Sequence, residues 1–169
     1  MRNFLAAASR PPALPPTVAW WTSSCNANPI ARRAGFLDHR QWFFPSGTGI
    51  VHATLAGHPG ALMFSAADGQ TRQVGAGCML LGVQEDATFQ SEAVPFAAGD
   101  AIVLFTDGVS EASDPGRNQY GAARLEGQVK RHGQSTARTI AEEINADVSR
   151  HCQGQPMNDD YTVLVVKRV

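Results

Sequence analysis

Apolar and polar positions form regular patterns only in the part of the chain that follows residue 46. Before it, no period of 2 or 3.6 residues is sustained. Six of the ten prolines also lie there, and they favour extended or irregular backbone. The pattern predicts an irregular segment rich in Pro, Trp and Arg at 1–46 and an ordered domain at 47–169. For residues 1–46, disorder or an unrelated origin stands as an alternative to folding.

Several short strands are predicted after residue 46. The stretch GIVHATLAGH predicts a strand that ends at Gly57, and ATFQSEAVPF predicts another. The stretch ALMFSAADGQTRQV predicts a hairpin, because Asp68-Gly69 between two strand-like runs is a strong turn signal. The run Ala101–Phe105 is apolar throughout, which is typical of a central strand covered on both faces. A last strand is predicted at 161–167.

Two helices are predicted between the last two strands. The first covers about 122–131 and ends at Gly133. The second covers about 135–152, with Ser135 as its N-cap. Apolar residues recur every four positions in the second helix, at Ile140, Ile144 and Val148, which predicts one buried face. The order of elements predicts an α+β domain, with a largely antiparallel sheet and two C-terminal helices packed on it.

Composition narrows the class of protein. A length of 169 residues suggests one domain, and a net charge of −1 gives no electrostatic case for nucleic acid or an anionic membrane as partner. No apolar run approaches the roughly 20 residues of a membrane span, and Arg10-Pro11-Pro12 stops the apolar start too early for a secretory signal. Three scattered cysteines without a CxxC favour reduced thiols. We therefore expect a cytoplasmic protein.

Two acidic features stand at the ends of predicted strands. Asp107 follows Ala101–Phe105, and Asp159-Asp160 precede the last strand. If these strands are antiparallel neighbours, the acids share one rim of the sheet. Two carboxylates about 4 Å apart repel by roughly 4 kcal/mol at an effective dielectric near 20, which a cation would offset. Oxygen ligands alone favour Mg²⁺ or Mn²⁺. Read one at a time, a plain turn and an Asx-turn are the simpler interpretations.

Five motifs favour the metal-site interpretation over the two turns. They occur in order with suitable gaps: AGHPGALMF, LLGV, AAGDAIVLFTDGVSEA, NQYGAARL and NDDYTVLVV. Together they resemble the C-terminal half of the metal-dependent protein phosphatases, the PPM family. The resemblance is strongest to the bacterial branch typified by the stage II sporulation phosphatase SpoIIE, and it covers about residues 47–169.

The resemblance implies a fold, an activity and a set of site residues. It implies part of a PPM-type β-sandwich and hydrolysis of phosphoserine or phosphothreonine at two Mn²⁺ or Mg²⁺ ions. By resemblance, Asp107 and Asp159 are metal ligands. Gly108 and Asp160 support them. His58 could act as an acid, but a lone histidine at a strand end is more often structural, so we expect it to hold the adjoining loop by hydrogen bonds. The implied substrates are phosphorylated proteins, such as the antagonists of anti-sigma factors in bacterial partner switching.

The N-terminal part departs from the family pattern. The GGDFYD-like and DVSGKG-like strings that carry the family's other aspartates do not occur, and Asp38 is the only acid before Asp68. We therefore expect weak metal binding and weak or no activity from this chain alone. Three explanations stay open. In the first, the chain is a piece of a larger phosphatase and is separated from its N-terminal half or from a fused sensor domain. In the second, it is a non-catalytic binding or regulatory module. In the third, a second chain supplies the missing half of the site.

Overall fold

The computed structural model describes residues 4–9, 19–23, 39–44, 48–57, 60–75, 79–80, 83, 88–157 and 159–169. Their elements follow in this order: β1 (Phe4–Ser9), β2 (Ala19–Ser23), β3 (His39–Phe44), β4 (Ile50–Ala56), β5 (Ala61–Phe64), β6 (Thr71–Val74), β7 (Ser91–Pro95), β8 (Ala101–Phe105), α2 (Asp107–Ser110), α3 (Ala122–His132), α4 (Ala137–Cys152) and β9 (Thr162–Lys167). They form two compact units. One contains Met1–Pro12, Ala61–Arg72 and Ala97–Val169, and the other contains Ala13–Gly60 and Gln73–Phe96.

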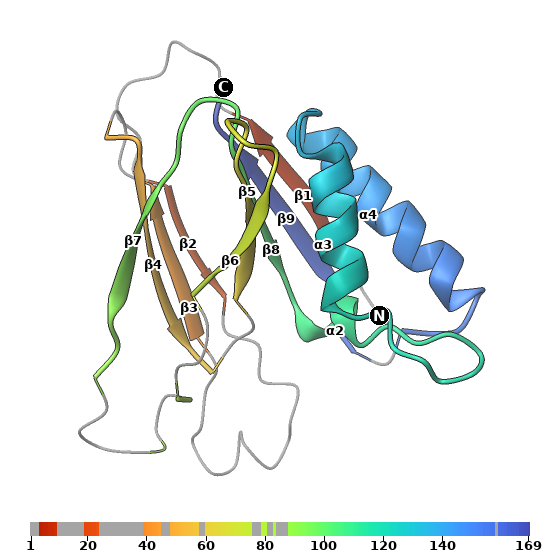
Figure 1. Cartoon of the computed structure of the whole chain (residues 1–169). Helices are drawn as coiled ribbons and strands as arrows, with labels where there is room; N and C mark the ends of the chain where they lie inside the picture. The colour runs from red at the N-terminus through yellow and green to blue at the C-terminus, as the bar shows by residue number, and fades with distance from the viewer. Residues whose placement is uncertain are drawn as a thin grey trace. The chain divides into compact units, whose positions relative to one another are not determined.

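The larger unit is built on a five-stranded sheet with the order β1-β9-β8-β5-β6 (Figure 1). Strand β8 lies in the middle, antiparallel to both β5 and β9, and all five of its residues are buried. The predicted central position of Ala101–Phe105 is therefore confirmed. The hairpin at Asp68-Gly69 is confirmed too, since the Ser65 amide donates to the Gln70 carbonyl at 2.9 Å.

Helices α3 and α4 cover one face of this sheet (Figure 1). The predicted stripe Ile140, Ile144 and Val148 is fully buried against the sheet. Each such aliphatic side chain contributes about 1.5–3 kcal/mol relative to exposure. This stripe therefore explains why an otherwise polar helix stays on the sheet.

The ends of the two helices differ from the sequence prediction in detail. The side chain of Thr136, not Ser135, accepts the Thr139 amide at 3.2 Å and caps α4. Both residue types cap helices, so the prediction was one residue early. Helix α3 ends before Gly133 as predicted, but Gly133 has right-handed helical backbone, with φ −58°. Its lack of a side chain matters for packing instead, because a Cβ there would lie 2.3 Å from the Phe64 ring.

Two glycines of this region should respond in opposite ways to alanine. Gly127→Ala in α3 should stabilise the fold by about 0.5–1 kcal/mol, because no atom lies within 4 Å of the new methyl group. Gly133→Ala should destabilise it by about 1–3 kcal/mol, since the buried Phe64 ring must move. Urea unfolding of both variants checks this, and shifts of the same sign would contradict it.

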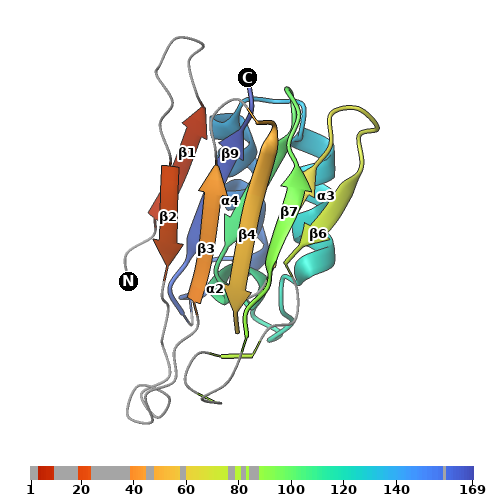
Figure 2. The same ribbon diagram turned by 90° about the vertical axis from the view of Figure 1, so that its left-hand side faces the viewer.

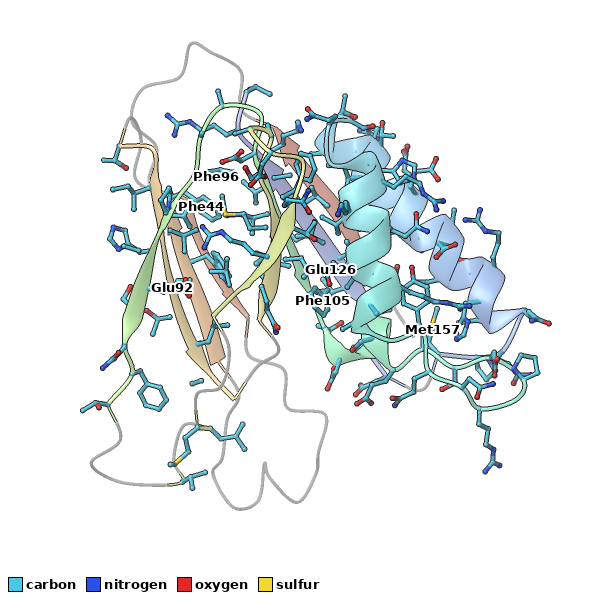
Figure 3. All side chains as sticks on the ribbon, viewed as in Figure 1. Phe44, Glu92, Phe96, Phe105, Glu126 and Met157 are labelled. Carbon is cyan, nitrogen blue, oxygen red and sulfur yellow. The ribbon has the colours of Figure 1, made fainter. Side chains whose placement is uncertain are left out.

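The second unit contains a four-stranded sheet with the order β2-β3-β4-β7, antiparallel throughout (Figure 2). Trp42 is fully buried, and its ring stacks on Phe44 with centroids 6.5 Å apart. Phe44 also meets Phe96 edge to face at 6.2 Å (Figure 3). Aromatic pairs of this kind add about 0.5–1.5 kcal/mol beyond the area they bury.

Strands β1, β2 and β3 lie in the segment whose sequence shows no sustained period. Proline-rich stretches and adjacent tryptophans hide the alternation that would indicate strands. The division of the chain at residue 46 stays a prediction. The α+β class, the largely antiparallel sheets and the two C-terminal helices are confirmed. Within the described ranges, no helix is both long and apolar enough to cross a membrane.

Candidate metal centre

The two predicted aspartate segments lie on one rim of the five-stranded sheet. Strands β8 and β9 are antiparallel, and their pairing ends at Phe105 opposite Val163. Phe105 is the last residue of β8 (Figure 3), so the chain beyond it meets the chain that enters β9. Asp107 begins the short helix α2 at this rim (Figure 1). Asp159 and Asp160 come shortly before β9, separated from it by Tyr161, and reach the same rim.

Gly108 brings these two segments into direct contact. A Cβ built on Gly108 would lie 2.4 Å from the carbonyl oxygen of Asp160 and 3.3 Å from the carbonyl carbon of Asp159. Real side chains do not approach a backbone that closely, so a residue without a side chain is required here. The close approach holds Asp107, its chain neighbour, next to the Asp159-Asp160 pair.

Both carboxylates are held in the same way. One oxygen of Asp107 accepts the Gly108 amide at 3.0 Å, and one oxygen of Asp159 accepts the Asp160 amide at 2.7 Å. Among the described residues, the second oxygen of each accepts no hydrogen bond. Asp107 and Asp159 are half-buried, whereas Asp160 is exposed. Within the described ranges, each aspartate therefore has one oxygen held by an amide and a second oxygen that could meet a cation.

Thr106 joins the same two segments and was not predicted from the sequence. Its hydroxyl donates to the Asp160 carbonyl at 2.8 Å and accepts the Thr162 amide at 3.0 Å. Its own amide donates to the Thr162 carbonyl at 3.2 Å. In the sequence, Thr106 is a polar residue directly after five apolar ones. That position is a signal of a special role, but it does not identify the hydrogen-bond partner.

The residues at this rim fit part of a divalent metal site. Carboxylate oxygens are the ligands that Mg²⁺ and Mn²⁺ prefer. However, nowhere in the described ranges do three or more His, Cys, Asp or Glu side chains gather around one point. Asp107 and Asp159 could hold such an ion together with water or other groups as the remaining ligands. His58 and Asp38 lie outside the described residues.

The segment that follows α2 is fixed to the helices. The Tyr120 hydroxyl donates to the Asp147 carboxylate in α4 at 2.8 Å, and the Tyr120 amide donates to the Ala112 carbonyl at 2.7 Å. Burial raises the pKa of the Tyr120 hydroxyl, and the bond to Asp147 raises it further. Burial also acts to raise the pKa of the Asp147 carboxyl, but hydrogen bonds from Arg150 and Tyr120 outweigh it and hold that pKa below its usual value. These contacts anchor the chain that leaves the candidate site.

Solved structures of other proteins share the fold of this chain. The chain matches the SiaA-PP2C domain of Pseudomonas aeruginosa with a TM-score of 0.68 at 19% identity, over 79% of this chain and 52% of that one. It also matches the structure of the PP2C phosphatase domain, with a fragment of the regulatory domain, of SpoIIE from Bacillus subtilis. The TM-score is 0.63 at 20% identity, over 76% of this chain and 37% of that one. The described elements therefore have the PP2C phosphatase fold.

Sequence comparison then identifies the family. The family described as stage II sporulation protein E (SpoIIE) matches residues 42–169, and the chain belongs to it. The chain is also 28% identical over 116 residues to the phosphoserine phosphatase RsbU of Bacillus subtilis strain 168, which covers 67% of this chain and 33% of that protein. It thus spans about a third of that relative and about half of the SiaA domain.

The resemblance carried by the five sequence motifs is confirmed by these comparisons, and the partial coverage agrees with a C-terminal part. The enzyme class that it implied, a PPM-type protein serine/threonine phosphatase, is confirmed at the level of the family. The metal-binding and supporting roles of individual residues stay predictions.

Proposed function

We propose that this chain supplies the C-terminal part of a metal-dependent protein serine/threonine phosphatase. In this proposal Asp107 and Asp159 bind Mn²⁺ or Mg²⁺, Gly108 and Asp160 support them, and His58 of the AGHPG motif holds a neighbouring loop. The main support is the close approach of Gly108 to the Asp160 carbonyl, which joins two residues 52 positions apart in the chain at one carboxylate-bearing rim. Membership of the SpoIIE family supports the same assignment.

The chemistry of such a site divides between the metal and the chain. A bound divalent ion would supply an activated water and neutralise charge on the phosphoryl group. The chain's own part is to hold the ion, through the carboxylate oxygens that Gly108 and Asp160 leave unoccupied. Those two amides restrict the side-chain rotation of Asp107 and Asp159, so less conformational entropy is lost when an ion binds.

The proposal includes a class of substrate and a cellular setting. We propose phosphorylated serine or threonine proteins of bacterial signalling, such as a phosphorylated antagonist of an anti-sigma factor, and a cytoplasmic location. The similarity to the phosphoserine phosphatase RsbU supports this choice. We further propose that the chain alone has weak or no activity, because two carboxylates without partners bind Mg²⁺ poorly.

A phosphatase assay on the purified chain tests the proposal. Turnover of p-nitrophenyl phosphate and of a phosphoserine peptide with Mn²⁺ should stay close to background, and any residual rate should vanish with EDTA and in Asp107→Asn. The matched control is Asp68→Asn, a carboxylate of the hairpin at the opposite end of the sheet. Robust turnover that is lost in Asp107→Asn would contradict the proposal that the chain alone is weakly active or inactive. Turnover that survives EDTA would overturn the metal-dependent mechanism.

A second candidate function is a non-catalytic binding or regulatory module of the same family. It is favoured by the observation that, in the described part of the chain, no group of three or more metal-ligating side chains occurs. Such a module should capture a signalling partner in a pulldown that survives both EDTA and Asp159→Ala. Loss of the partner under either condition would favour the metal-dependent function instead.

A further inference from the structure

The contacts of Thr106 differ in kind from those of an ordinary strand residue. Its side chain is 2% exposed, so water does not substitute for its partners. A hydroxyl has one hydrogen to donate and lone pairs to accept. Here the donor is used on the Asp160 carbonyl and an acceptor on the Thr162 amide. Both partners belong to the segment that carries Asp159, whereas Thr106 itself is the chain neighbour of Asp107.

The hydroxyl also extends the contact between β8 and β9 beyond the end of their pairing. The strand register ends at Phe105 and Val163, while Asp160 lies two residues before the start of β9. The Asp160 carbonyl that accepts the hydroxyl is the same atom against which Gly108 packs. Thr106 and Gly108 therefore both lie against this one carbonyl.

We propose that Thr106 is a positioning residue that couples Asp107 to Asp159 through its hydroxyl, so that the two carboxylates move as one unit. The inference rests on the proposed function, since it assigns a role at the same metal site. Groups that orient metal ligands from outside typically change metal affinity by 10–100-fold when they are lost. Thr106→Val keeps the shape of the side chain and replaces the hydroxyl with a methyl group.

Mn²⁺ affinity of the full chain provides the first test, measured from the electron paramagnetic resonance signal of the free ion. Thr106→Val should raise the dissociation constant by about tenfold or more, and Thr106→Ser should restore the affinity because it keeps the hydroxyl. Thr136→Val is the matched control, since it removes a threonine hydroxyl that caps α4. The inference would be overturned if Thr106→Val bound Mn²⁺ as tightly as the natural chain, or if Thr136→Val lost as much Mn²⁺ affinity as Thr106→Val.

Hydrogen exchange of the metal-free chain separates this inference from the proposed function. The Thr162 amide, which donates to the Thr106 hydroxyl, should exchange at least about tenfold faster in Thr106→Val than in the natural chain or in Thr136→Val. Thr106→Ser should restore slow exchange. If the natural chain binds no Mn²⁺, the proposed function fails and the exchange result alone decides the coupling. An unchanged Thr162 exchange rate in Thr106→Val would then overturn the inference.

Discussion

Gly108→Ala should destabilise the chain by about 1–3 kcal/mol and abolish measurable Mn²⁺ binding. The new methyl group would lie 2.4 Å from the Asp160 carbonyl oxygen and 2.9 Å from its carbon. That carbonyl cannot yield in the way a flexible side chain does, because the Thr106 hydroxyl donates to it at 2.8 Å. The two aspartate segments must therefore separate, and the carboxylates lose their common position.

Urea unfolding and Mn²⁺ titration of Gly108→Ala measure the two parts of this effect. Gly127→Ala is the control, because it adds the same methyl group to an exposed helix position with no atom within 4 Å. We expect the control to keep the Mn²⁺ affinity of the natural chain. Natural stability together with natural Mn²⁺ affinity in Gly108→Ala would show that the contact between the segments does not form.

Asp107→Asn and Asp159→Asn should each weaken Mn²⁺ binding by at least about tenfold, since each removes a charged ligand and not merely an orienting neighbour. The metal-free variants should be as stable as the natural chain or more stable. An asparagine keeps the oxygen that accepts the Gly108 or Asp160 amide, and it removes one of the like charges on the rim.

Calorimetric Mn²⁺ titration and thermal unfolding check both halves of this expectation, with Asp68→Asn as the exposed control. Loss of Mn²⁺ affinity without loss of stability would identify a ligand role. An equal loss of Mn²⁺ affinity in Asp68→Asn would point to general electrostatic attraction. Natural affinity in either rim variant would remove that aspartate from the site.

The parts of the fold that the sequence predicted have strong local signals. Ala101–Phe105 is apolar at every position, and the structure buries all of it in the centre of a sheet. The four-residue repeat of Ile140, Ile144 and Val148 is readable without knowledge of the partner surface, because an α-helix repeats every 3.6 residues. The rim position of the acids followed from the pairing assumed for two strands, which β8 and β9 confirm.

The features that escaped prediction depend on contacts between distant parts of the chain. The hydroxyl of Thr106 meets a carbonyl 54 residues away, and only the register of β8 on β9 brings them together. Strand β1 pairs in parallel with β9, although FLAAAS has no alternation and alanine is depleted in strands. Gly133 appeared suited to a left-handed helix end, but its close packing against Phe64 depends on tertiary structure.

The central claim is that Asp107 and Asp159 form a single cation site at one rim of the sheet. Its most direct test is a Mn²⁺ titration of the ¹⁵N-labelled chain followed by nuclear magnetic resonance, because the paramagnetic ion broadens the signals of nearby amides. We predict that the amides of 106–110 and 159–162 broaden first and at the same Mn²⁺ concentration. Broadening of one segment without the other, or earlier broadening around Asp68 or Asp114, would contradict the claim.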